Sequence, residues 1–145
     1  MATDFIHIGV TVTDLERSIE FYSKWLGFKR VDGLRFPPEF FEDSHTLFRL
    51  PDGVYCDMVM IQSEDLKCVL ELFRFSNVKA GEQAIWNKTG IHHLAFKVPN
   101  IPELYERMAA DGVEFYIPPK EREKGTGEHW IYFKDPDGVM LELWD

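Results

Sequence analysis

Histidine and glutamate recur at matching places in two halves of the chain. His7 opens the run HIGVTV and His93 opens HLAFKV. Farther along each half, Glu71 stands inside VLELF and Glu142 inside MLELW. Taken alone, each of these residues is more typical of a structural or solvent-facing position. Their recurrence in pairs indicates one site, because two imidazoles and two carboxylates can neutralise a divalent cation and leave positions for water or substrate.

The elements that must position these residues also repeat. Each histidine begins a short strand, and a stretch with apolar residues at helical spacing follows, up to Gly27 in the first half and Gly112 in the second. Thr13 with Glu16 predicts a capping box for the first helix, and Asn100 predicts the cap of the second. Each half therefore reads as strand, helix, then further strands.

Strand alternation predicts which way the histidines face. Successive side chains in a strand point to opposite faces, so His7 shares its face with Gly9 and Thr11 while the apolar residues between them share the other. The apolar face packs on the helix, which leaves the histidine on the opposite, concave side. The same alternation favours His93 over its neighbour His92, which falls on the helix-facing side.

The length of 145 residues suits one domain. We predict an α+β fold over residues 1–145, made of a first module at about 4–76, a linker at about 77–90 with a short helix at 82–86, and a second module at about 91–145. The first half is the longer one, and we place its extra residues in a loop at 33–46.

The composition narrows the kinds of partner that the protein is expected to bind. The 16 basic and 25 acidic residues give a net charge of −9, which disfavours nucleic acid and anionic membranes. The sequence contains no apolar run of membrane-spanning length and no signal-peptide pattern, so we expect a cytoplasmic protein. Cys56 and Cys68 lie in apolar, strand-like segments, and we interpret both as buried reduced thiols.

Three segments carry a family resemblance: HIGVTVTDLERSIEFYSKWLGF, GIHHLAFKVPNI and DPDGVMLELWD. They resemble the paired βαβββ modules of the glyoxalase, or vicinal oxygen chelate, superfamily. The resemblance implies a cupped, mixed β-sheet and one metal ligand from the first and last strand of each module, here His7, Glu71, His93 and Glu142. It also implies one divalent ion (Ni, Zn, Co, Mn or Fe), a small-molecule substrate and a homodimer.

The ligand set resembles that of glyoxalase I, which moves a proton between neighbouring carbons of a hemithioacetal. By this resemblance Glu142 would be the principal base and Glu71 its counterpart. The residues that hold glutathione in such enzymes, two arginines and an asparagine, are replaced here by Thr11, Phe75 and Thr89. We therefore predict a metal-dependent lyase or isomerase that acts poorly on the glutathione adduct.

Two alternatives remain open on the same scaffold. One is an extradiol-type dioxygenase, although such enzymes have histidine where Glu71 stands. The other is a noncatalytic small-molecule binding or resistance module, which would lack metal. Glu71 favours proton transfer over oxygen activation.

Two loops are expected to set specificity. Phe40 and Phe41 in the 33–46 loop, together with Phe75 and Thr11, are predicted substrate-pocket walls. The charged segment at 118–128 could be a lid or a surface hairpin. We interpret its basic residues, Lys120, Arg122 and Lys124, as a solvated charge run rather than an anion site.

Overall fold

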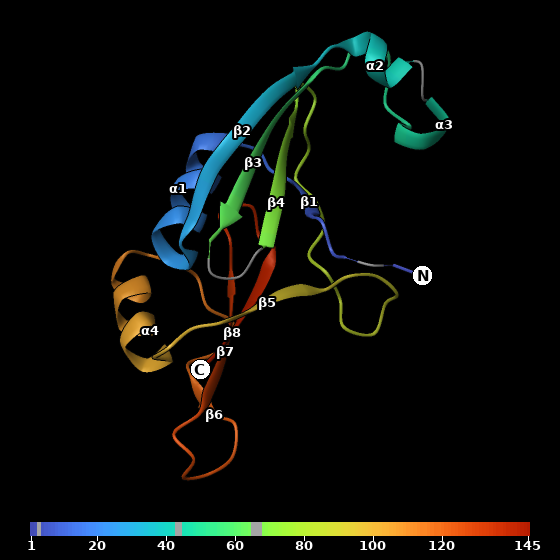
Figure 1. Ribbon diagram of the computed structural model, residues 1–145. Coiled ribbons are helices and arrows are strands. Elements are labelled where there is room, and N and C mark those ends of the chain that lie inside the picture. The colour runs from blue at the N-terminus through green and yellow to red at the C-terminus, as the bar shows by residue number, and fades with distance from the viewer. Residues whose placement is uncertain (3, 43–44, 65–67) are drawn as a thin grey trace. The chain divides into compact units, whose positions relative to one another are not determined.

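The chain divides into two compact units, Met1–Ala80 and Gly81–Asp145. The computed structural model describes residues 1–2, 4–42, 45–64 and 68–145 (Figure 1). The boundary between the units falls inside the segment interpreted as a linker. The prediction of a short helix at 82–86 is wrong, because this segment has no helical hydrogen-bonding pattern and Trp86 lies in a turn.

The first unit is a mixed four-stranded sheet with the order β1-β4-β3-β2. The parallel pair is β1 with β4, and the other neighbours are antiparallel. Its elements are β1 (Ile8–Thr11), α1 (Leu15–Leu26), β2 (Phe28–Phe36), α2 (Pro38–Glu42), α3 (His45–Phe48), β3 (Cys56–Ser63) and β4 (Cys68–Phe75).

The second unit repeats this topology, with the order β5-β8-β7-β6 and β5 parallel to β8. Its elements are β5 (His93–Lys97), α4 (Ile101–Ala110), β6 (Lys120–Glu121), β7 (His129–Lys134) and β8 (Met140–Trp144). The α+β class and the two βαβββ modules that the family resemblance implied are therefore confirmed.

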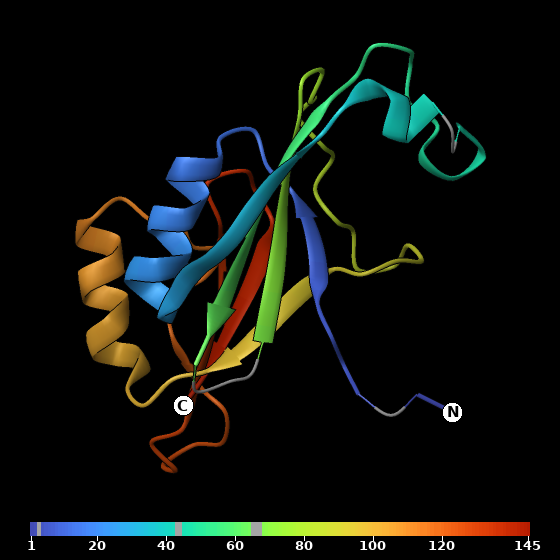
Figure 2. The same ribbon diagram turned by 45° about the horizontal axis from the view of Figure 1, so that its top comes forward.

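One helix packs on one face of the sheet in each unit, and Glu71 and Glu142 lie on the other face. In the first unit α1 contacts β2, β3 and β4 (Figure 2). Val10 and Val12 are buried while Gly9 and Thr11 are exposed, as strand alternation predicts. On β4 the buried residues Leu70 and Leu72 flank the half-buried Glu71. This alternation turns Glu71 away from the apolar core.

The helix caps agree only in part with those predicted from the sequence. Asn100 caps α4 by accepting a hydrogen bond from the Glu103 N–H, as predicted. The cap of α1 is Asp14 rather than Thr13, because the Asp14 carboxylate accepts the Arg17 N–H at 3.1 Å. A carboxylate at this position also interacts favourably with the positive end of the helix dipole.

The predicted 33–46 loop is mostly regular structure. β2 continues to Phe36, and α2 and α3 follow, with residues 43–44 outside the described part of the chain. The 118–128 segment belongs to a hairpin, since Lys120 and Glu121 of β6 pair with Trp130 and His129 of β7. The hairpin interpretation of this segment is thus correct.

The cysteines are free thiols that begin neighbouring antiparallel strands and so lie at opposite ends of the ladder. Cys56 is buried, and burial raises its pKa to about 11. Cys68 is only half-buried, so its predicted burial is wrong. None of the helices that the structure describes combines the length and the apolar character needed to cross a bilayer.

Candidate active site

The first unit brings His7 and Glu71 together. His7 precedes β1 directly, and the parallel pairing of β1 with β4 sets Gly9 opposite Glu71. The His7 Nε2 lies 3.4 Å from the Glu71 Oε2, with side chains that are 44% and 17% exposed. The imidazole and the carboxylate are therefore adjacent on an accessible face.

The second unit builds the same pair from its own strands. His93 opens β5, and Ala95 pairs with Glu142 on β8, which is the register that Gly9 and Glu71 have in the first unit. The His93 Nε2 lies 3.2 Å from the Glu142 Oε2, and the Glu142 side chain is only 7% exposed. Within either unit, the described residues form no larger cluster of His, Cys, Asp and Glu, so each pair offers two ligands.

The geometry of both pairs fits a divalent metal ion. Two ligand atoms that each lie about 2.1 Å from a metal are about 3.0 Å apart at a right angle and about 3.4 Å apart at the tetrahedral angle. The observed Nε2 to Oε2 separations of 3.4 and 3.2 Å lie within this span. Each pair combines a carboxylate oxygen with an imidazole nitrogen, which are both common ligands of such ions.

Packing rather than hydrogen bonding orients His93. Its Nδ1 is buried and finds no hydrogen-bond partner among the described residues. The Trp86 ring lies 5.3 Å from the imidazole, and the Tyr132 ring meets it edge-on at the same distance. The His92 ring also contacts Trp86, on which it stacks at 5.0 Å between ring centres. Of the two histidines, His93 is the one whose Nε2 lies beside the Glu142 carboxylate.

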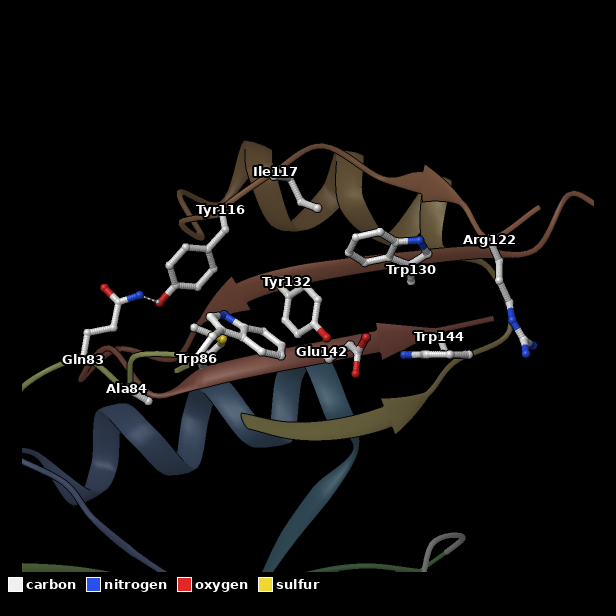
Figure 3. Close-up of a pocket in the computed structure, with 11 residues that line it drawn as sticks. Gln83, Ala84, Trp86, Tyr116, Ile117, Arg122, Trp130, Tyr132, Glu142 and Trp144 are labelled. Carbon is white, nitrogen blue, oxygen red and sulfur yellow. Dashed lines mark hydrogen bonds between the residues drawn. The ribbon is translucent and has the colours of Figure 1, made fainter. Parts of the chain in front are cut away.

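Sequence reasoning missed Tyr132. This residue pairs directly with Glu142 across β7 and β8, and its hydroxyl faces the carboxylate (Figure 3). Burial and the hydrogen bond to Glu142 raise the pKa of Tyr132 to about 12, so the hydroxyl stays a donor. The matching position in the first unit, opposite Glu71, is Met60, which has no such donor. The alternation in HWIYFK could have revealed it, because it places Tyr132 on the sheet face away from the buried Ile131 and Phe133.

A cavity of about 690 Å³ in the second unit contains Glu142 in its wall. Aromatic side chains dominate the lining, and Arg122 from the predicted charge run is part of it (Figure 3). The lining consists of Gln83, Ala84, Trp86, Tyr116, Ile117, Arg122, Trp130, Tyr132, Met140, Glu142 and Trp144. Arg122 is 54% exposed, as expected of a solvated charge run, and it also borders the cavity that holds a candidate site residue.

The predicted pocket walls lie in the first unit. Phe40 and Phe41 of α2 contact each other at 5.2 Å, and the Phe41 ring lies 5.6 Å from Phe75 at the end of β4. Phe41 is buried while Phe40 is 45% exposed. Thr11, the last residue of β1, is exposed. The structure thus gathers the three phenylalanines in one aromatic cluster, and their contact with substrate stays a prediction.

Known proteins are similar to the chain in sequence and in fold. The chain is 28% identical to a lactoylglutathione lyase of Pseudomonas putida over 96% of this chain and 83% of that protein. It is also 28% identical to a 2-epi-5-epi-valiolone epimerase of an Actinomyces species, over 94% of this chain and 76% of that protein. These two relatives bear different enzyme names at the same identity, so they do not single out one reaction.

The fold of a glyoxalase family protein from Bacillus cereus superposes with a TM-score of 0.80 at 18% identity, covering 99% of this chain and 94% of that one. A sequence model of the Glyoxalase/Bleomycin resistance protein/Dioxygenase superfamily matches residues 4–143. With the duplicated βαβββ modules in place and the match spanning nearly every residue, the chain belongs to the Glyoxalase/Bleomycin resistance protein/Dioxygenase superfamily.

Proposed function

We propose that the protein is a metal-dependent lyase or isomerase that moves a proton next to a metal-bound carbonyl of a small oxygenated substrate. His7, Glu71, His93 and Glu142 are the proposed ligands, two from each unit, and the active form is a homodimer. The observation that carries the proposal is the identical strand register of the two His–Glu pairs, with Nε2 to Oε2 separations of 3.4 and 3.2 Å.

The residues divide the work as follows. When bound, a divalent ion acts as a Lewis acid that acidifies a C–H next to a carbonyl. The Glu142 carboxylate takes the proton from one carbon and returns it to the neighbouring carbon. The Tyr132 hydroxyl donates to Glu142 and limits its rotation, while its ring supports His93. The aromatic walls beside Glu142 give the substrate an apolar surface to lie against.

The relatives support this class of reaction. A lactoylglutathione lyase and an epimerase are both among them, and both names are compatible with proton transfer beside an oxygen-bearing carbon. Glu71 distinguishes the proposal from an oxygen-activating enzyme, because a second carboxylate provides another proton acceptor and another negative charge at the metal.

Metal content and proton exchange test the proposal together. Elemental analysis of purified protein should find about one divalent ion per chain. In D₂O the metal-loaded protein should catalyse deuterium uptake into the methylene group of hydroxyacetone or 2-hydroxyacetophenone, followed by NMR. Oxygen consumption by iron-loaded protein with a catechol would replace the proposal by the dioxygenase reaction. Absence of bound metal would favour a noncatalytic binding module.

We expect Tyr132→Phe to weaken metal binding about tenfold, because outer partners of metal ligands commonly contribute 10- to 100-fold to affinity. The phenyl ring keeps its edge contact with His93 and removes only the hydroxyl beside Glu142. Zinc titration by calorimetry measures the effect. Tyr116→Phe is the matched control, because its hydroxyl lines the same cavity but accepts from the Gln83 Nε2 at 2.7 Å. Equal zinc affinity in Tyr132→Phe and the wild type would remove Tyr132 from the site.

We expect poor turnover of the methylglyoxal–glutathione hemithioacetal. Thr11 and Phe75 cannot supply the charged and amide contacts that the resemblance to glyoxalase I calls for, and charge-assisted hydrogen bonds contribute about 1.5 to 3 kcal/mol each. Nickel-loaded and zinc-loaded protein should be compared with a known glyoxalase in the same assay. Efficient turnover would identify the protein as a lactoylglutathione lyase with other anchoring residues.

A further inference from the structure

We propose that the cavity of the second unit binds an aromatic organic anion, with the ring between the tryptophans and the anionic group at Arg122. The proposal deepens the function above, and it rests on that function only in naming Glu142 as the group beside the bound ring. It assigns a substrate class, an aryl carboxylate, to a site that is otherwise defined only by its His–Glu pair.

The aromatic lining carries the first half of the proposal. Five of the residues that border the cavity are tryptophan or tyrosine: Trp86, Tyr116, Trp130, Tyr132 and Trp144. Trp86 remains 53% exposed and Trp144 37% exposed, although both have large apolar surfaces. A flat apolar ligand that covers exposed indole rings around a concavity lowers the free energy of the complex. Each aromatic pair stabilises it by about 0.5 to 1.5 kcal/mol beyond the contribution of the buried area.

One face of each tryptophan is already covered, Trp86 by His92, Trp130 by Lys120 and Trp144 by Arg122, and the opposite face is the one left for a ligand. Tyr132 meets both Trp86 and Trp130 edge-on, with interplanar angles of 88° and 75°. Edge contacts hold each ring at a fixed angle without covering both faces by stacking. The lining is therefore preorganised by its own contacts.

Arg122 carries the second half of the proposal, which is the binding of the anionic group. Its guanidinium lies 4.9 Å from the centre of the Trp144 ring and borders the cavity. The neighbouring carboxylate of Glu128 approaches only to 3.6 Å, which is too far for a hydrogen bond, and both side chains are more than half exposed. Among the described residues the guanidinium makes no side-chain hydrogen bond, so its planar N–H groups can bind a carboxylate in a bidentate manner.

The surroundings reinforce a positive end of the cavity. Lys120 lies over the outer Trp130 ring at 5.8 Å, which adds a second cation near Arg122. The Glu121 carboxylate accepts the Gly125 N–H at 3.0 Å. Two cations thus lie beside Trp130 and Trp144, and the Glu128 carboxylate 3.6 Å from Arg122 offsets part of their charge.

Figure 3 shows how the lining residues are distributed along the cavity. Arg122 and Trp144 occupy one end, Gln83 with Tyr116 occupies the other, and Glu142 lies between them beside Tyr132. An anionic group at Arg122 is thereby kept away from the Gln83 end, and the ring is placed over the strand that carries Glu142. Arg122 is the one cation among the described residues that line the cavity, so an aryl carboxylate has one favoured orientation.

Binding in the presence of EDTA separates this proposal from the metal site. The probes are 2-naphthoate, its neutral isostere 2-naphthamide, and cyclohexanecarboxylate, titrated by calorimetry into the full chain. We expect 2-naphthoate to bind about tenfold more tightly than 2-naphthamide and than cyclohexanecarboxylate, as one partly exposed charge-assisted contact allows. Because none of the probes has two adjacent oxygens on neighbouring carbons and EDTA removes metal, failure of the proposed reaction would not affect this result.

Two matched variants test whether Arg122 causes the preference for 2-naphthoate. Arg122→Gln should abolish the preference for 2-naphthoate while leaving 2-naphthamide affinity unchanged, which also shows that the fold is intact. Lys124→Gln removes the same charge from the same hairpin without bordering the cavity, and it should keep the preference. The proposal is overturned if 2-naphthamide binds as tightly as 2-naphthoate to the wild type. It is also overturned if Lys124→Gln acts like Arg122→Gln, since that result would indicate only long-range charge.

Discussion

Glu142→Gln should lower deuterium exchange into 2-hydroxyacetophenone by about 10²- to 10⁴-fold, the range that a positioned general base contributes. Glutamine keeps the shape of the side chain and its oxygen can still bind a metal ion weakly, but an amide cannot accept the substrate proton at neutral pH. The fall should therefore appear in turnover more than in metal content. NMR integration of the methylene signal over time measures the exchange, and elemental analysis of the same sample measures the metal.

Two further variants make this result decisive. Glu114→Gln alters an exposed carboxylate that pairs with Lys134 at 2.9 Å, and it should exchange deuterium at the wild-type rate. Glu71→Gln should lose less activity than Glu142→Gln, since Glu142 lies in the cavity and receives the Tyr132 hydrogen bond. The opposite order, with Glu71→Gln inactive and Glu142→Gln active, would exchange the roles of the two carboxylates.

The duplicated architecture was predictable because each of its signals is local. Strand alternation around Val10 and Val12 and the helical spacing that ends at Gly27 follow from side-chain periodicity and backbone conformation alone. The repeat then supplied what a single segment could not, because matched positions in two modules must occupy matched places in space. This is how the adjacency of His7 with Glu71, and of His93 with Glu142, could be expected before any distance was known.

The features that sequence reasoning missed depend on contacts between segments. Thr13 and Asp14 are both good caps, and only the backbone path into α1 decides that Asp14 meets the Arg17 N–H. Tyr132 faces Glu142 because β7 and β8 pair in one particular register, and a shift of one residue would turn it to the other face. Trp86 lies in an irregular segment with no periodicity, so nothing in the sequence predicted its contact with His93.

His93→Ala should reduce zinc affinity by more than about 100-fold, whereas His92→Ala should leave it nearly unchanged. The two histidines are chain neighbours and both touch the Trp86 ring, so they share local environment and differ chiefly in what their nitrogens face. Only His93 sets Nε2 at 3.2 Å from a Glu142 oxygen. Loss of a ligand costs more than loss of an outer partner, whose removal commonly reduces affinity 10- to 100-fold.

Thermal unfolding provides a readout of the same prediction that does not depend on catalysis. A ligand that binds only the folded state stabilises it by about 2.7 kcal/mol at 100 times its dissociation constant, so zinc should raise the melting temperature of the wild type and of His92→Ala. The melting temperature of His93→Ala should change little when zinc is added at the same concentration. If zinc stabilised His93→Ala fully and failed to stabilise His92→Ala, then His92 would be the ligand, and the face assigned to these residues from strand alternation would have to be reversed.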